Sequence, residues 1–265
     1  MLLSLSKSLK TETIAIGTVV GIAVVLLVVF LAWYAAEGER PFVATAHVIN
    51  LDRDAKKLES FRKQPLTSLL PVPVERWTAT YGKDLNPRTL PAQGIGNLTV
   101  CAGKGTYKEQ WKELRNQGAI GCFLSHRSLL QHCATLQVPD TAGHLILEDD
   151  ALFADDFRTK WEAVRNHIPV DWDVVYLGIN TPKGHSIGKG VSKLYAVRDS
   201  TGNWGTHGYM VRHGALRTKI LPQLRFMFEA VDGQLNAFFD EWNCYAITPQ
   251  LITVDKSLGS TIQKM

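Results

Sequence analysis

Short apolar runs separated by amphipathic and polar segments make up most of the chain. Apolar runs bounded by turn-forming residues predict buried strands, which we place at residues 46–51, 72–80, 143–147, 174–177 and 208–211. Apolar residues three or four positions apart predict amphipathic helices, which we place at residues 52–62, 108–116 and 121–136. The Gly-containing segments 82–107 and 178–190 are predicted loops.

This alternation of strands and helices predicts the fold class. It indicates an α/β fold of the Rossmann type, with a mostly parallel sheet covered by helices on both faces. The segment 46–265 has a suitable length for one such domain and contains no internal repeat.

One apolar run differs from all the others. Residues 14–34 contain no charged side chain, and a helix of that length spans about 30 Å, the thickness of a bilayer core. Trp33 and Tyr34 end the run where interfacial aromatic residues are common, and Lys7 and Lys10 precede it. The lysines place the short N-terminus in the cytosol. We therefore predict a cytosolic tail (1–13), a transmembrane signal-anchor (14–34), a stalk (35–45) and a lumenal catalytic domain (46–265). A cleaved signal peptide is the alternative.

Composition and charge exclude several other classes. The 265 residues are 45% hydrophobic and 20% charged, which is typical of a globular protein and not of a disordered chain. The net charge of +4 comes from scattered Lys and Arg residues, so we expect no nucleic-acid partner. The four cysteines form no C-x-x-C pair, so neither a disulfide framework nor a cysteine-rich zinc motif is predicted.

Three consecutive carboxylates follow the predicted strand at residues 143–147. Glu148, Asp149 and Asp150 stand at its carboxyl end, which is where open α/β sheets bind ligands. Hard divalent cations bind carboxylates together with phosphate oxygens. The triplet therefore predicts a site for a metal ion and a diphosphate, with a solvated acidic turn as the alternative.

A set of short motifs in a fixed order resembles glycosyltransferase family 25, which includes bacterial lipopolysaccharide-sugar transferases and the procollagen galactosyltransferases. The resemblance extends over residues 46–262 and rests on the segments VINLDR (48–53), WTATYG (77–82), AIGCFLSH (119–126), ILEDDA (146–151), WDVVYLG (172–178), THGY (206–209) and VD (231–232). It implies a GT-A-like fold and a metal-dependent glycosyltransferase. The implied enzyme uses Mn²⁺ or another divalent cation and moves a hexose, galactose or glucose, from a UDP-sugar to a hydroxyl of a glycan or hydroxylysine.

The resemblance also implies which residues bind the UDP-sugar donor. Asn50, Leu51 and Arg53 fall at the first strand–helix turn, where such folds hold the nucleotide, and the Arg53 guanidinium suits a phosphate or a base edge. Glu148 and Asp150 are the implied metal ligands, with Asp149 contacting the donor. In the AIGCFLSH segment, Ser125 and His126 are expected to contact the donor as well. The alternative is that they cap and pack the start of a helix.

Family members form β-linkages from α-linked donors, which implies inversion and a base that removes the acceptor proton. Asp232 and Glu229 are the candidates, and Asp232 is preferred because it falls in the VD segment. An N-terminal cap for the following helix is the alternative role for Asp232.

A membrane-tethered, catalytically silent glycan-binding or adhesion module is the alternative function. The complete acidic triplet favours the enzyme. Either reading gives a single-pass type II membrane protein with its folded domain in the lumen of the Golgi or endoplasmic reticulum.

Overall fold

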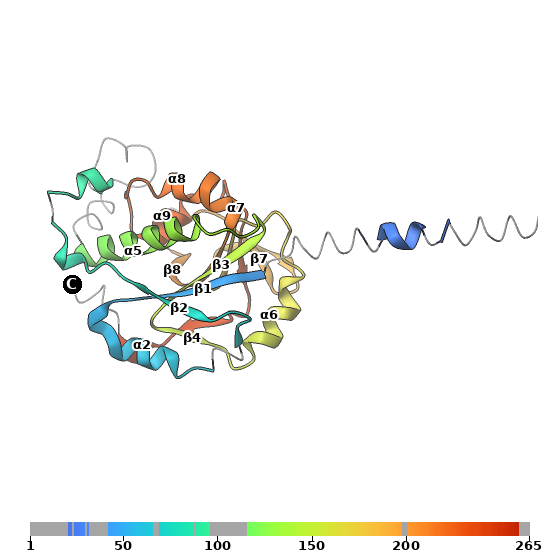
Figure 1. Cartoon of the computed structure of the whole chain (residues 1–265), viewed down its shortest axis with the longest axis horizontal. Helices are drawn as coiled ribbons and strands as arrows, with labels where there is room; N and C mark the ends of the chain where they lie inside the picture. Colours follow the sequence, from blue (N-terminus) through green and yellow to red (C-terminus); the bar gives the residue numbers. More distant parts are fainter. Residues whose placement is uncertain are drawn as a thin grey trace, which may run out of the picture. The chain divides into compact units, whose positions relative to one another are not determined.

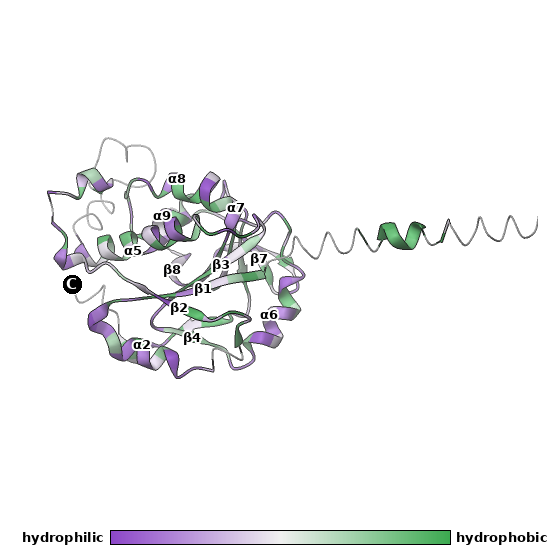
Figure 2. Cartoon of the chain, viewed as in Figure 1, coloured by the Kyte–Doolittle hydropathy of each residue, from purple (hydrophilic) through white to green (hydrophobic). Residues whose placement is uncertain are grey.

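The computed structural model describes residues 21–22, 24–29, 31, 42–65, 69–86, 88–95, 116–197 and 201–259. The chain separates into two units, residues 1–40 and 41–265. In the first unit the described residues of segment 21–31 are helical and almost uniformly hydrophobic (Figure 2). Among the described residues, no helix combines the length and hydropathy needed to cross a membrane. Residues 1–20, the stalk as far as residue 41 and the predicted helix at 108–116, except its last residue, lie outside the described residues.

The second unit is built on one large mixed sheet. Its eight strands lie in the order β2-β1-β3-β8-β5-β9-β7-β6, and a separate two-stranded sheet joins β10 to β4. The strands are β1 (Phe42–Asn50), β2 (Val74–Thr78), β3 (Ala142–Glu148), β4 (Ala151–Phe153), β5 (Val174–Asn180), β6 (Gly184–Gly188), β7 (Val191–Leu194), β8 (Trp204–Arg212), β9 (Cys244–Ile247) and β10 (Ile252–Val254).

Helices cover both faces of this sheet. The α-helices are α2 (Ala55–Arg62), α5 (Gln117–Cys133), α6 (Phe157–Arg165), α7 (His213–Ala215), α8 (Leu221–Gln223) and α9 (Val231–Asn236). Short 3₁₀ turns are η1 (Asp52–Asp54), η2 (Gly82–Asp84), η3 (Pro91–Gln93) and η5 (Lys256–Leu258), and η4 (Leu216–Ile220) is a π-helical turn. Figure 1 shows α5, α7, α8 and α9 on one side of the sheet and α2 and α6 on the other. This arrangement confirms the predicted α/β class.

The direction of the strands agrees with the prediction only in part. β1 runs parallel to β2 and β3, and β5 runs parallel to β9. However, β8 lies between β3 and β5 and is antiparallel to both, and the β6–β7 hairpin adds two further antiparallel pairings. The sheet is therefore mixed, because its centre and one edge contain strands of opposite direction.

Alternation along the strands fills a separate core on each face. On β3, Ile146 belongs to the cluster beneath α5 and α9, whereas its neighbours Leu145 and Leu147 belong to the cluster beneath α2 and α6. All three are fully buried. A strand buried on both faces needs a continuous apolar sequence, which explains why the sequence predicted a buried strand here.

Several predicted boundaries were wrong. Residues 178–190 are not a loop, because β5 continues through Gly178 to Asn180 and β6 pairs with β7 as a hairpin. The predicted helix at 121–136 begins four residues earlier, where the Asn116 side chain caps α5 by accepting hydrogen bonds from the N–H groups of Gly118 (2.9 Å) and Ala119 (3.2 Å).

The first turns of α5 lie unusually close to the segment that follows β2. A Cβ atom on Gly121 would come within 2.7 Å of Thr80 O and 2.8 Å of Gly82 N, and one on Gly82 would come within 1.7 Å of Gln117 O. All of these neighbours are backbone atoms, which cannot rotate away. Glycine is therefore required at both positions for the helix to pack this tightly.

Gly121→Ala should destabilise the domain, although Ala normally favours a helix by about 1 kcal/mol over Gly. Overpacking against backbone typically costs about 1–3 kcal/mol, so we expect a Tm several degrees lower in thermal unfolding followed by circular dichroism. Gln131→Ala, an exposed change on the same helix, is the control. A Tm for Gly121→Ala equal to or above that of the wild type would contradict this packing argument.

Candidate functional site

The candidate site is a cavity at the carboxyl ends of β1 and β3. These parallel strands are adjacent, with Ile49 of β1 opposite Glu148 of β3, so the residues that follow each strand meet at one edge. The first turns of α5 form the opposite wall. The cavity holds about 600 Å³ including its open mouth, and it is lined by Ile49, Asn50, Leu51, Asp54, Lys57, Ala79, Thr80, Gly118, Cys122, Ser125, His126, Glu148, Asp149 and Asp150.

Most of the residues predicted for the donor and the metal ion meet in this cavity. Seven of them line it: Asn50, Leu51, Ser125, His126, Glu148, Asp149 and Asp150. Arg53 is not among the lining residues. Its guanidinium lies 4.9 Å from the centre of the Tyr81 ring and donates a hydrogen bond to the Tyr81 hydroxyl.

Asn50 connects the two strand ends. Its Nδ2 donates to Asp149 Oδ2 (2.7 Å) and to the Asp54 carbonyl (3.1 Å), while its Oδ1 accepts from Arg76 Nε (3.0 Å). Arg76 also forms an ion pair with Asp52. The buried Asn50 side chain therefore has its orientation set from both sides, and it fixes Asp149 in turn.

Asp149 faces the only cationic side chain that lines the cavity among the described residues. Lys57 Nζ lies 3.7 Å from Asp149 Oδ1 and donates to the Gly259 carbonyl at 2.9 Å. Burial nonetheless raises the pKa of Asp149, with Asn50 and Lys57 opposing the rise. Lys57 thus offsets part of the negative charge of the triplet.

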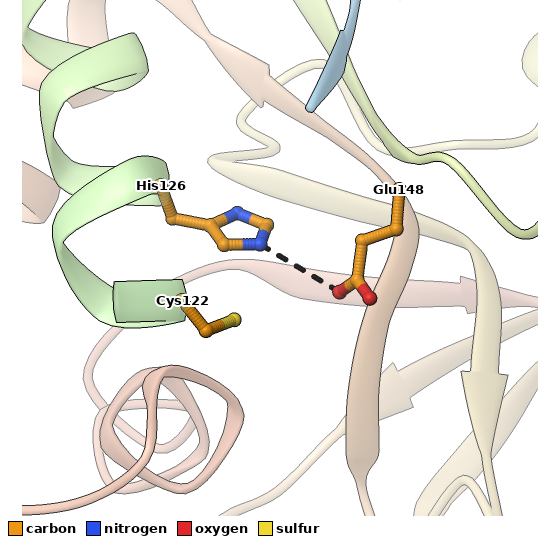
Figure 3. Close-up of side chains that lie close together, drawn as sticks. All are labelled: Cys122, His126 and Glu148. Atoms are coloured by element: carbon orange, nitrogen blue, oxygen red, sulfur yellow. Dashed lines mark ion pairs between the residues drawn. The ribbon is translucent and has the colours of Figure 1, made fainter. Parts of the chain in front are cut away.

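Glu148 is held on its other side by Thr206 and His126. Thr206 Oγ1 donates to Glu148 Oε1 at 2.6 Å, and His126 Nε2 lies 3.6 Å from the same oxygen (Figure 3). Burial opposes ionisation of Glu148, but the contacts with His126 and Thr206 outweigh burial and lower the pKa of Glu148 to about 2. Glu148 is therefore ionised at neutral pH.

Asp150 has the opposite environment. Its Oδ1 is buried without a hydrogen-bond partner among the described residues. Burial and the neighbouring charges of Glu148 and Asp149 raise the pKa of Asp150 to about 7. Its backbone is fixed, because Asp255 N donates to the Asp150 carbonyl at 2.8 Å beside the β4–β10 pairing. An unpartnered carboxylate oxygen at the edge of such a cavity suits a hard divalent cation.

Ser125 and Cys122 belong to the wall formed by α5. The Ser125 hydroxyl accepts from Thr80 N (2.8 Å) and donates to the Gly121 carbonyl (2.6 Å), so it fastens α5 to the segment after β2. This contact agrees with the packing role considered for Ser125. Cys122 projects from the same helix toward His126 and Glu148 (Figure 3).

The two predicted base candidates do not line the cavity. Asp232 lies in the first turn of α9, and its carboxylate accepts from the backbone N–H of Gly205 and of Gly233, both at 2.9 Å. Burial raises the pKa of Asp232, and the charge of Glu148 adds to that rise. Glu229 packs against Gly233, where a Cβ atom would come within 2.4 Å of Glu229 Cγ.

The sequence analysis did not single out Lys57, Cys122 or Thr206 for the site. Cys122 and Thr206 lie in the AIGCFLSH and THGY segments, so the motifs included both residues but did not predict a role for either. Lys57 stands on the helix that follows the first strand, and only the folded chain shows that it reaches Asp149.

Comparison with known proteins identifies the family. The profile described as "Glycosyltransferase family 25 (LPS biosynthesis protein)" matches residues 43–233, which is well over half of the chain. The chain belongs to this family, as its motifs predicted.

Several curated relatives are similar over part of their length. A glycosyltransferase 25 family member of Drosophila pseudoobscura pseudoobscura is 30% identical over 196 residues, 73% of this chain and 29% of that protein. Procollagen galactosyltransferase 2 of Homo sapiens is 27% identical over 137 residues, 50% of this chain and 20% of that protein. Inactive glycosyltransferase 25 family member 3 of Mus musculus is 29% identical over 154 residues, 52% of this chain and 25% of that protein. The chain therefore spans less than a third of each of these relatives.

Proposed function

We propose that this protein is a metal-dependent glycosyltransferase that transfers a hexose from a UDP-sugar to a hydroxyl of a glycan or of hydroxylysine. The observation that supports it most is the buried Asp150 Oδ1, which has no partner within the described ranges of the chain and lies in a cavity with Glu148 and Asp149. Galactose is the favoured hexose because a relative is named a procollagen galactosyltransferase, with glucose as the second choice.

The cavity contains side chains that suit a nucleotide-sugar donor. Asn50 and Leu51 line it at the end of β1, and Arg53 stands one turn further on, beside Tyr81. We assign the nucleotide to these residues, with Ser125 and His126 on the opposite wall. Lys57 is within reach of a diphosphate that displaces it from Asp149, because a lysine ammonium binds phosphate as a mobile point charge.

Asp150 and Glu148 are the proposed ligands of the divalent cation. Asp150 is the first choice because its Oδ1 is buried without a hydrogen-bond partner among the described residues, whereas Glu148 Oε1 accepts from Thr206. When bound, a cation such as Mn²⁺ stabilises the negative charge that develops on the departing diphosphate. Asn50 and Lys57 keep Asp149 turned toward the same cavity.

We propose Asp232 as the base that removes the acceptor proton during an inverting displacement, with Glu229 as the second candidate. Burial raises the pKa of Asp232, which makes its carboxylate a better proton acceptor. The predicted capping role is wrong, because Ala230 is the N-cap of α9 and Asp232 lies within its first turn. The two backbone hydrogen bonds, one of them to Gly205 of β8, nevertheless suit a purely structural role, so a kinetic experiment has to separate this role from that of a base.

A catalytically silent glycan-binding module is the competing function. It is favoured by one finding, that some relatives, such as the Mus musculus protein, are named inactive. UDP release separates the two functions, because a silent module binds glycan without consuming a donor.

The first test measures UDP release from UDP-galactose and UDP-glucose. The wild type should release UDP with Mn²⁺ and lose this activity in excess chelator. Asp150→Ala should abolish transfer and weaken UDP binding in Mn²⁺ without loss of fold, whereas Asp155→Ala, an exposed change nearby, should behave as the wild type. Undiminished activity in chelator, or normal activity of Asp150→Ala, would disprove metal dependence.

The second test concerns Asp232. A positioned base contributes about 10²–10⁴-fold to a rate, so Asp232→Asn should lower turnover by that factor with UDP binding nearly unchanged, and Glu229→Gln should lower it far less. Loss of the structural hydrogen bonds to Gly205 and Gly233 alone would lower Tm and leave the turnover of the folded protein intact. That outcome, or a product that keeps the anomeric configuration of the donor, would reject the assignment.

We further propose that residues 14–34 anchor the protein as a single-pass type II membrane protein, with the larger unit in the Golgi or endoplasmic reticulum lumen. The support comes from the charge-free run and the preceding Lys7 and Lys10. Full-length protein should stay with membranes during alkaline carbonate extraction, and added protease should spare residues 41–265 in sealed vesicles. Release by carbonate would refute the anchor, and digestion of the larger unit would refute the orientation.

A further inference from the structure

Three side chains with different donor atoms converge at the inner end of the cavity. Cys122 and His126 lie four residues apart on one face of α5, and Glu148 ends β3 opposite them (Figure 3). The Cys122 sulfur, a ring nitrogen of His126 and a carboxylate oxygen of Glu148 all lie within 4.8 Å of one another. The mechanism proposed above leaves the Cys122 thiol without a role.

The His126 ring has one buried nitrogen that is available to a ligand. His126 is fully buried, and its Nε2 has no hydrogen-bond partner among the described residues. The nearest acceptor oxygen, on Glu148, is 3.6 Å away, which is longer than a hydrogen bond. A buried polar atom without a partner is unfavourable, so a ligand bound to Nε2 would remove this penalty.

The other ring nitrogen of His126 has a hydrogen-bond partner of the kind found in metal sites. His126 Nδ1 lies 3.0 Å from the Tyr209 hydroxyl, and the two rings are stacked with centroids 5.8 Å apart. Without a metal ion, Nδ1 accepts from the Tyr209 hydroxyl and Nε2–H faces Glu148. When a metal ion binds, the ring hydrogen is carried by Nδ1, which then donates to Tyr209 Oη, and the Nε2 lone pair is available to the metal ion. Such an outer hydrogen bond is what fixes the tautomer of metal-binding histidines.

We propose that Cys122, His126 and Glu148 form a binding site for Zn²⁺ or a similar borderline-soft divalent metal ion. At the usual Zn–N and Zn–O distances of about 2.0 Å, tetrahedral geometry separates the two ligand atoms by roughly 3.3 Å. The 3.6 Å between His126 Nε2 and Glu148 Oε1 requires only a small contraction.

The sulfur, nitrogen and oxygen ligand atoms favour zinc over Mn²⁺, the cation proposed for the transferase reaction. Mn²⁺ and Mg²⁺ prefer oxygen ligands, whereas thiolate and imidazole favour zinc. Binding converts the Cys122 thiol to a thiolate with release of one proton. Three protein ligands leave a fourth position open toward the cavity, as in zinc sites that exchange a water molecule or another ligand.

The site also has a regulatory consequence, and this part rests on the proposed function. Glu148 belongs both to the zinc ligands and to the proposed ligands of the donor's cation. Zinc at Cys122 and His126 therefore competes for Glu148 and should inhibit the Mn²⁺-dependent reaction.

Zinc binding is tested on the purified full-length protein with ZnCl₂ alone, by equilibrium dialysis and elemental analysis. The wild type should retain one zinc ion per chain, including in excess Mn²⁺. Removal of an outer hydrogen bond typically weakens metal binding 10–100-fold, so Tyr209→Phe should weaken it by that factor and Cys122→Ala or His126→Gln by about 100-fold or more. Cys133→Ala is the matched control, because this buried free cysteine lies on the same helix outside the site.

A second readout identifies the sulfur ligand directly. Substitution with Co²⁺ should give a thiolate-to-cobalt charge-transfer band that is present in the wild type and in Cys133→Ala and absent from Cys122→Ala. Failure of the wild type to retain zinc, or equal retention by folded Cys122→Ala, would overturn the site. Because neither measurement uses a sugar donor, this outcome is independent of whether the protein releases UDP.

Discussion

The concentration of negative charge at the end of β3 is the constraint on which the rest of the site depends. Three consecutive carboxylates at the end of a fully buried strand are unfavourable unless other groups compensate them. The fold supplies side-chain partners to two of the three. Thr206 and His126 hold Glu148, and Asn50 and Lys57 hold Asp149, whereas Asp150 Oδ1 has no hydrogen-bond partner in the part of the chain that the structure describes. Because the negative charge is only partly compensated, Asp150 remains available for the cation that we propose to bind there.

These partners come from distant parts of the chain, and two features bring them together. Parallel pairing of β1 with β3 places Asn50 beside Asp149. The backbone contact at Gly121, reinforced by the Ser125 hydroxyl, presses the start of α5 against the segment after β2. His126 consequently projects from α5 toward Glu148. A change in either contact would move one wall of the cavity relative to the other.

The sequence predicted the parts of this arrangement that depend on local pattern. Continuous apolar runs located the buried strands, and the acidic triplet located the cavity edge. Pairing direction was not readable, because the buried run of β8 has the same sequence pattern whether its neighbours are parallel or antiparallel. The β6–β7 hairpin was missed because its Gly and Lys residues resemble a loop. The association of Cys122 with Glu148 depends on packing α5 against the sheet, so no spacing rule for metal ligands could have shown it.

The unequal compensation of the triplet also separates the roles of two neighbouring acids. Contacts with His126 and Thr206 lower the pKa of Glu148 to about 2, whereas burial and its charged neighbours raise the pKa of Asp150 to about 7. Near neutral pH, Glu148 is therefore a fixed charge and Asp150 is partly protonated. A cation that binds Asp150 must displace that proton, so its affinity falls as the pH drops below about 7. Environments that push the pKa values of adjacent acids apart are a recurring way to give them different tasks, and here the difference originates in the contacts of Glu148 with His126 and Thr206, for which Asp150 Oδ1 has no equivalent among the described residues.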